Sequence, residues 1–111
     1  ISSDCSLNGM ASPSYSISKS ALNTYVQNIA RKYIHQNIVI NAFLPGPFIY
    51  KNSYWDQVKN SNPEKYKSKV NQLFTKNFFN VSDISKSVYN YCKSHSIISS
   101  GSLILINGGN T

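Results

Sequence analysis

The sequence has few cysteines, little arginine and no long hydrophobic run, and each shortage excludes a class of protein. Cys5 and Cys92 stand far apart without metal-ligand spacing, which argues against a disulfide framework and predicts reduced thiols in the cytoplasm. No apolar run approaches the length of a membrane span. The chain opens Ile1-Ser2-Ser3-Asp4, without an initiator Met or a signal peptide. We therefore expect a cytoplasmic protein without membrane contact, whose natural N-terminus lies upstream.

The charge balance is basic but does not indicate a nucleic-acid partner. The formal net charge is +7, from 11 Lys and Arg residues against 4 Asp and Glu residues. A basic balance of this kind is one sign of nucleic-acid binding. Arg31, however, is the only arginine, and arginine is the usual reader of phosphates and base edges. Since no nucleic-acid motif accompanies the lysines, we expect no such partner.

The longest regular pattern is an amphipathic segment from Tyr15 to about His35. Its apolar residues recur at helical spacing, so the segment predicts a long helix with one buried face. Ser14 is the expected N-cap and Asn37 the expected break after the helix. Residues 4–14 contain Gly, Pro and small polar residues, which predict a loop.

Three short apolar segments predict strands of a parallel sheet: Ile1–Ser3 as a strand end, Ile38–Leu44 and Leu103–Ile106. Helices are expected between them, and strands that alternate with helices imply right-handed crossovers. Two strands and a strand end are too few for a stable sheet of this kind. The sequence therefore predicts an α/β fold, the C-terminal portion of a doubly wound parallel-sheet (Rossmann-like) domain, incomplete in this chain.

The region between the two full strands is expected to be partly irregular and partly helical. Residues 49–59 are aromatic and irregular, and Asn62-Pro63 predicts a helix start that continues to about Phe74. A further helix is expected to begin at Ser82 or Asp83. Its expected inner face consists of Ile84, Val88, Tyr89 and Cys92.

Tyr15 and Lys19 stand four residues apart at the head of the long predicted helix. Side chains at this spacing lie on the same face, one turn from each other. An ammonium group at this distance favours the phenolate form of a tyrosine. Such a tyrosine can give a proton to a carbonyl oxygen or take one from an alcohol. The same spacing also occurs on many helices without a catalytic role, so the pair alone does not identify a site.

Four motifs in this order make the chain resemble the short-chain dehydrogenase/reductase family. Ile1-Ser2-Ser3 resembles the end of the strand that delivers the catalytic serine. Tyr15 to Lys19 matches the Tyr-x-x-x-Lys signature, and Asn41 to Gly46 matches the Asn-x-x-x-Pro-Gly segment. Gly101 to Gly109 resembles the closing strand, with Asn107 where the family usually has Asp. The resemblance covers nearly the whole chain.

The resemblance implies an NAD- or NADP-dependent oxidoreductase that interconverts a small-molecule carbonyl and alcohol. Tyr15 would be the general acid for reduction and the base for oxidation, and Lys19 would assist it. Ser3 would hold the substrate oxygen. The usual number of residues between the catalytic serine and the tyrosine in this family would fit Ser2, which stays open as the alternative, although we favour Ser3. The implied cofactor-binding residues are Tyr15, Lys19, Pro45, Gly46 and Phe48.

The Gly-rich turn that holds the cofactor's pyrophosphate in this family has no counterpart in the glycine spacing of the chain. We therefore expect residues 1–111 to be the C-terminal fragment of a single NAD(P)-binding domain, inactive by itself and a homo-oligomer when intact. Residues 50–79 occupy the place of the family's substrate lid. Its aromatic residues would either line an apolar pocket or pack the lid helix. The alternative function is a non-catalytic remnant of this fold that acts as an interaction surface.

Overall fold

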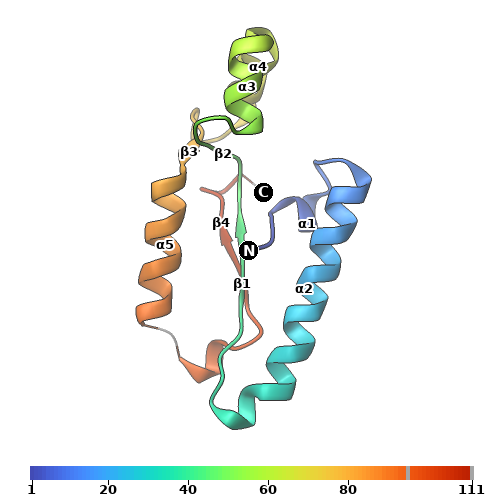
Figure 1. Cartoon of the computed structure of the whole chain (residues 1–111), viewed down its shortest axis with the longest axis vertical. Coiled ribbons are helices and arrows are strands. Elements are labelled where there is room, and N and C mark those ends of the chain that lie inside the picture. Colours follow the sequence, from blue (N-terminus) through green and yellow to red (C-terminus); the bar gives the residue numbers. More distant parts are fainter. Residues whose placement is uncertain (95, 111) are drawn as a thin grey trace.

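A computed structural model describes residues 1–94 and 96–110, and its strands are parallel (Figure 1). Strand β1 (Ala42–Pro45) pairs with β4 (Leu103–Ile106), and Ala42 lies opposite Leu103. A second, smaller sheet joins β2 (Phe48–Ile49) to β3 (Phe79–Asn80), also in parallel. The expected α/β fold with a parallel sheet is confirmed, and β4 has the predicted bounds.

Five α-helices and two short 3-10 helices in the described residues surround these strands. They are α1 (Cys5–Asn8), α2 (Pro13–Tyr33), η1 (Ile34–Gln36), α3 (Tyr54–Ser61), α4 (Pro63–Gln72), α5 (Val81–Lys93) and η2 (Ile97–Ser99). Figure 1 shows α2 and α5 on opposite sides of the β1–β4 sheet, with α3 and α4 beyond the end at which β1 finishes. The long helix therefore runs alongside the sheet.

Strand β1 is the centre of the core because its alternate side chains pack against different helices. Leu44 is completely buried and, with Ala42, forms a cluster with Val26 of α2. Phe43, which lies between them in the sequence, packs edge-on against Tyr91 of α5 with ring centroids 5.3 Å apart. Both faces of the strand are thus covered, as its continuous apolar sequence predicts.

The first residues run along the edge of β1 that faces away from β4. The Ser2 N–H donates to the Phe43 carbonyl at 2.8 Å, and the Asp4 N–H donates to the Pro45 carbonyl at 3.1 Å. Bonds two residues apart on both segments are the pattern of strand pairing. Residues 1–3, expected to be the end of a strand, thus run hydrogen-bonded alongside β1, although the sheet itself consists of β1 and β4.

Two boundaries near the long helix differ from the prediction. Residues 5–8 form α1 rather than a loop, and the Ser3 Oγ accepts the Cys5 N–H at 3.2 Å at its start. The prediction of Ser14 as N-cap is wrong, because α2 begins at Pro13 after Ser12. Proline suits the first helical position, where its missing N–H would have no partner within the helix. The break at Asn37 is confirmed by its left-handed φ of 58°.

Strand β1 is shorter than predicted, since Ile38–Asn41 lie outside it. The Ile40 carbonyl accepts the Gly101 N–H at 2.8 Å, and the Ile40 N–H donates to the Ser100 side chain. The segment is therefore hydrogen-bonded to the turn before β4 rather than to the strand itself.

The structure also corrects the helices that follow. Residues 54–61 form α3, where irregular chain was expected, and the Ser53 side chain caps it by accepting the Asp56 N–H. Helix α4 ends at Gln72, before Phe74. Helix α5 begins at Val81 because Asn80 and Asp83 form a reciprocal capping box.

The inner face of α5 was only partly predicted. Ile84 is buried, but Tyr89 is 63% exposed and Cys92 is also exposed. Tyr91 faces the strand instead, as its contact with Phe43 shows. The prediction therefore placed Tyr89 and Cys92 on the buried face of α5 when both are exposed.

Candidate active site

The candidate site lies where the first residues, β1 and β4 reach their carboxyl ends (Figure 1). The segments are parallel, so these ends meet at one edge of the sheet. The amino end of α2, which carries Tyr15, lies near the same edge in Figure 1. Ligands of open α/β sheets bind outside the carboxyl ends of the strands.

Tyr15 and Lys19 lie on one face of α2, as their spacing predicts. The Lys19 Nζ is 5.7 Å from the centroid of the Tyr15 ring. The same ammonium donates to the Ile1 carbonyl at 3.4 Å, which connects the helix to the first strand segment. Tyr15 is 44% exposed, so its ring is open to a ligand at this edge. The structure therefore presents a phenol and an ammonium group together.

Ser2 and Ser3 are both buried, and their hydroxyl groups have different partners. The Ser2 Oγ donates to the Lys19 carbonyl at 3.2 Å and so fastens α2 to the strand segment. The Ser3 Oγ donates to the Asp4 Oδ1 at 3.4 Å and accepts the Cys5 N–H. Ser2 therefore bonds to the helix that carries Tyr15, whereas Ser3 bonds within the turn that follows the strand. The role of Ser3 stays a prediction.

The three residues expected against the nicotinamide lie at or just beyond the end of β1. Pro45 and Gly46 are buried, and the Gly46 N–H donates to the Ile106 carbonyl at 3.3 Å. A Cβ at Gly46 would lie 2.7 Å from the Asn107 Cβ, so the space beside Gly46 is filled by Asn107. Phe48 belongs to β2 and stacks on Tyr50 with ring centroids 6.1 Å apart. Their contact with a cofactor stays a prediction.

Sequence reasoning missed a buried polar pair at this edge. Asp4 and Asn107 are each 4% exposed, and the Asn107 Nδ2 lies 3.5 Å from the Asp4 Oδ2. Asp4 was assigned to a loop, and Asn107 was noted only as a departure from the family motif. One signal was available: both residues directly follow predicted strands, at the edge where parallel strands end.

The aromatic residues of the segment 50–79 pack mainly against one another. Trp55 of α3 contacts Phe78, with ring centroids 5.1 Å apart, and Tyr66 of α4 contacts the same ring at 5.2 Å. Tyr54 packs edge-on against Trp55. Phe74 is 75% exposed and takes no part in these contacts. Of the two alternatives for these aromatics, the structure thus favours packing within the segment 50–79.

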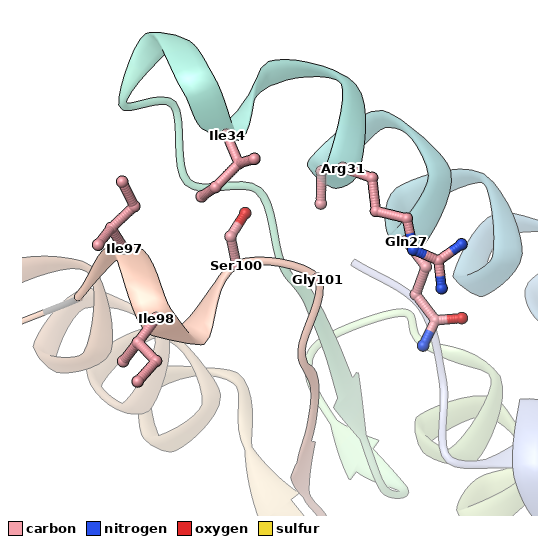
Figure 2. A pocket seen from close by; sticks show the side chains of 8 residues that line it. Gln27, Arg31, Ile34, Ile97, Ile98, Ser100 and Gly101 are labelled. Atoms are coloured by element: carbon pink, nitrogen blue, oxygen red, sulfur yellow. The ribbon is translucent and has the colours of Figure 1, made fainter.

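Two cavities of the described residues lie away from Tyr15 and Lys19. One, of about 320 Å³, lies at the amino end of β4, where Gln27 and Arg31 extend from α2 beside Ile34 and η2 (Figure 2). Another, of about 360 Å³, lies between the segment leading into β1 and helix α5.

Across residues 1–94 and 96–110, no cluster of His, Cys, Asp and Glu could hold a metal ion. Over the same residues, every helix is too short or too polar to cross a bilayer.

No disulfide joins Cys5 and Cys92, and their environments differ. Burial raises the pKa of the Cys5 thiol, and the nearby Asp4 carboxylate acts in the same direction. Because the thiolate is the reactive form, a raised pKa lowers the reactivity of the thiol at a given pH.

At pH 8 we expect iodoacetamide to modify Cys5 several-fold more slowly than the exposed Cys92, as followed by peptide mass spectrometry. Urea should remove the difference, and faster labelling of Cys5 in the native chain would contradict the assignment.

Comparison with known proteins gives the same fold. Residues 1–111 match the family model described as enoyl-(acyl carrier protein) reductase. Among curated proteins, no sequence matches the chain significantly. L-sorbose reductase from Gluconobacter frateurii, solved with NADPH and L-sorbose, is 21% identical with a TM-score of 0.79, and the match covers 97% of this chain and 44% of that one.

Two further solved structures are also similar to the chain. A 4-hydroxyisoleucine dehydrogenase complexed with NADH is 24% identical with a TM-score of 0.80, over 99% of this chain and 44% of that one. A 3-oxoacyl-[acyl-carrier protein] reductase from Brucella melitensis is 24% identical with a TM-score of 0.75, over 99% of this chain and 41% of that one. The chain thus spans less than half the length of these structures.

Proposed function

Because the chain belongs to the enoyl-(acyl carrier protein) reductase family of short-chain dehydrogenases/reductases, we propose that it carries the acid–base groups of an NAD(P)-dependent oxidoreductase. The substrate is a carbonyl compound or the corresponding alcohol. The observation that supports this proposal is the pairing of Tyr15 with Lys19 at the carboxyl edge of the sheet. Solved relatives with NADPH or NADH favour either dinucleotide as cofactor.

The residues at this edge fit the nicotinamide end of such a cofactor. The half-buried Lys19 ammonium offers hydrogen-bond donors suited to the hydroxyl groups of a ribose, and the exposed Tyr15 ring lies beside it. Pro45, Gly46 and Phe48 would form the wall beside the nicotinamide. The pyrophosphate needs other residues, because the glycines of this chain lack the phosphate-binding spacing.

In the proposed mechanism, a bound nicotinamide supplies or accepts the hydride. Tyr15 gives the proton of its hydroxyl to the carbonyl oxygen during reduction and takes it back during oxidation. Lys19 stabilises the phenolate that forms, because its ammonium lies beside the ring. On substrate binding, the Ser3 hydroxyl would turn its one proton from the Asp4 carboxylate to the substrate oxygen, where the hydrogen bond stabilises the developing charge.

We further propose that residues 1–111 are the C-terminal part of one NAD(P)-binding domain, with the substrate lid at residues 50–79. The intact protein is then this chain together with a preceding half that binds the pyrophosphate.

We also propose that the intact protein self-associates through the outer face of α2, where Ile17 and Tyr25 are 68% and 61% exposed. A strict monomer of the intact protein in light scattering at micromolar concentration would contradict this last part.

This division of the domain predicts different cofactor binding by the chain and by the intact protein. The purified chain of 111 residues should show no saturable binding of NADH or NADPH, because it lacks a phosphate-binding turn. The intact protein should bind one of them. Fluorescence titration of both proteins is the measurement, with circular dichroism to establish that the chain is folded. Saturable binding by the folded chain alone would refute the proposal that the preceding half of the domain binds the pyrophosphate.

Turnover separates the enzyme from its alternative, a non-catalytic remnant of this fold that serves as an interaction surface. The probes are L-sorbose, a 3-oxoacyl thioester and a 2-enoyl thioester, chosen from the chemistry of the similar proteins and of the family. We expect the intact protein to oxidise NADH or NADPH with a carbonyl probe. Binding of the dinucleotide without turnover of a wider series of ketones and aldehydes would favour the remnant.

A further inference from the structure

A cavity of about 320 Å³ lies beside the amino end of β4, between α2 and η2 (Figure 2). Figure 1 shows η2 and the carboxyl end of α2 far from the amino end of that helix, which carries Tyr15. The volume is at the lower limit for small-molecule pockets, which are mostly apolar with a few polar groups. The cavity is therefore separate from the candidate active site and suits a small ligand.

The cavity should stay open in the intact protein. Residues 1–4 bond to β1 along the edge that faces away from β4, as the bonds from the Ser2 and Asp4 N–H groups to its carbonyls show. Under the proposed division of the domain, the preceding half joins the chain at Ile1 and extends the sheet on that side. Strand β4 and the cavity beside it lie at the opposite edge.

One side of the cavity is made of isoleucine side chains. Figure 2 shows Ile34 of η1 on the same side as Ile97 and Ile98 of η2. Ile98 is 90% exposed and Ile97 is 47% exposed, so most of this apolar surface is in contact with water. A hydrocarbon group that covers it would remove apolar surface from water, which favours binding.

The other side of the cavity is cationic. Gln27 and Arg31 stand one turn apart on α2, and their polar ends extend beside each other (Figure 2). Within the described residues no carboxylate pairs with Arg31, because the acidic side chains belong to other parts of the fold: Asp4, Asp56, Glu64 and Asp83. The Ser100 Oγ accepts the Ile40 N–H at 3.2 Å, which leaves the hydroxyl proton without an acceptor among the same residues. The cavity thus offers hydrogen-bond donors and one positive charge.

We propose that this cavity binds a small aliphatic monocarboxylate. The hydrocarbon covers the three isoleucines, and the carboxylate accepts hydrogen bonds from the Arg31 guanidinium, with the Gln27 amide and the Ser100 hydroxyl as further donors. Arginine presents parallel N–H groups that match the two oxygens of a carboxylate. Arg31 is the one cation among the lining residues, so a single negative charge is the best match.

Methyl NMR of the intact protein, labelled at the isoleucine δ1 positions, tests the site with hexanoate as the probe. We expect saturable shifts of the Ile34, Ile97 and Ile98 signals, with a Kd of about 1 mM or tighter. Hexanamide has a similar shape without the charge and should bind about 10-fold more weakly, because hydrogen bonds to charged groups are stronger. Shifts at Ile17, close to Tyr15 in the sequence, without shifts at the cavity would overturn the proposal. So would the lack of saturable shifts at tens of millimolar hexanoate.

Two neighbouring cations on α2 provide a matched pair of variants. Arg31→Gln should weaken hexanoate binding by about 10-fold. Ile98→Asp should also weaken it, because the change removes apolar surface and adds a charge of the same sign as the ligand. Lys32→Gln is the control and should leave the Kd unchanged, since the Lys32 Nζ lies over the Tyr33 ring and outside the cavity.

All three substituted positions are exposed, so the variants should fold. An unchanged Kd in Arg31→Gln, or equal losses in Arg31→Gln and Lys32→Gln, would overturn the assignment of a carboxylate site. The measurement needs no turnover, so its result is independent of whether the intact protein is an oxidoreductase.

Discussion

Replacement of Tyr15 by Phe in the intact protein is expected to lower kcat by about 10²–10⁴-fold, the usual contribution of general acid–base catalysis. The change removes one oxygen and keeps the ring, so packing is barely altered. The ring is 44% exposed, and the Lys19 ammonium lies over the ring, a contact that the phenylalanine ring keeps. The Kd of the dinucleotide should therefore stay close to that of wild type. Steady-state kinetics and a fluorescence titration give the two quantities.

Matched variants separate the roles around Tyr15. Lys19→Ala should lower kcat and also weaken dinucleotide binding, because the ammonium is expected to contact both partners. Ser3→Ala should cost less than Tyr15→Phe, and Ser2→Ala should cost less still, since its hydroxyl bonds to the α2 backbone. A severe loss in Ser2→Ala with an active Ser3→Ala would assign the substrate contact to Ser2. Turnover at the wild-type rate in Tyr15→Phe would remove Tyr15 from the mechanism.

Replacement of Leu44 by Ala is expected to lower the free energy of unfolding by about 2–5 kcal/mol, the range for large-to-small changes in a core. Leu44 of β1 is completely buried against α2, where it packs with Val26. The lost contacts and the remaining cavity both contribute to the cost. The same helix carries Tyr15 and Lys19, so loosening this contact should also lower activity. Urea unfolding of the intact protein, followed by circular dichroism, measures the change.

Leu105 provides a matched control because it lies opposite Leu44 in the register of β1 and β4 but is 43% exposed. Leu105→Ala should cost markedly less in the same measurement. Equal losses at the two positions would show that another element covers Leu105 in the intact protein. A negligible loss for Leu44→Ala would contradict the assignment of the core.

The sequence predicted the elements whose signal is local. The helix around Tyr15 and the strand Leu103–Ile106 follow from periodicity and from short β-branched runs, and both are found. Helix α3 was missed because aromatic residues such as Trp55 obscured its capping serine, Ser53. The beginning of β1 was misplaced, at Ile38 instead of Ala42, because the length of a strand depends on how many residues its partner strand offers, which local pattern does not show.

In the candidate site, too, the contacts with a local sequence signal were predictable and the long-range contacts were not. The Tyr15–Lys19 pair was predictable because four residues on one helix fix its geometry. The pair of Asp4 and Asn107 was not, because its contact depends on three segments that end side by side and on the absence of a side chain at Gly46. Contacts between residues this far apart in the sequence need the register of the sheet, which only the three-dimensional structure gives.

The most direct measurement of the central claim is the transfer of deuterium from a nicotinamide cofactor deuterated at C4 to a carbonyl probe by the intact protein. Mass spectrometry of the product alcohol reads the transfer, and both C4 epimers are used so that either face is detected. We predict that one epimer labels the product in wild type and that labelling falls by about 10²–10⁴-fold in Tyr15→Phe. A folded, cofactor-binding protein that labels no product, or labels it equally with and without the Tyr15 hydroxyl, would contradict the assignment of this chain as the acid–base part of an oxidoreductase.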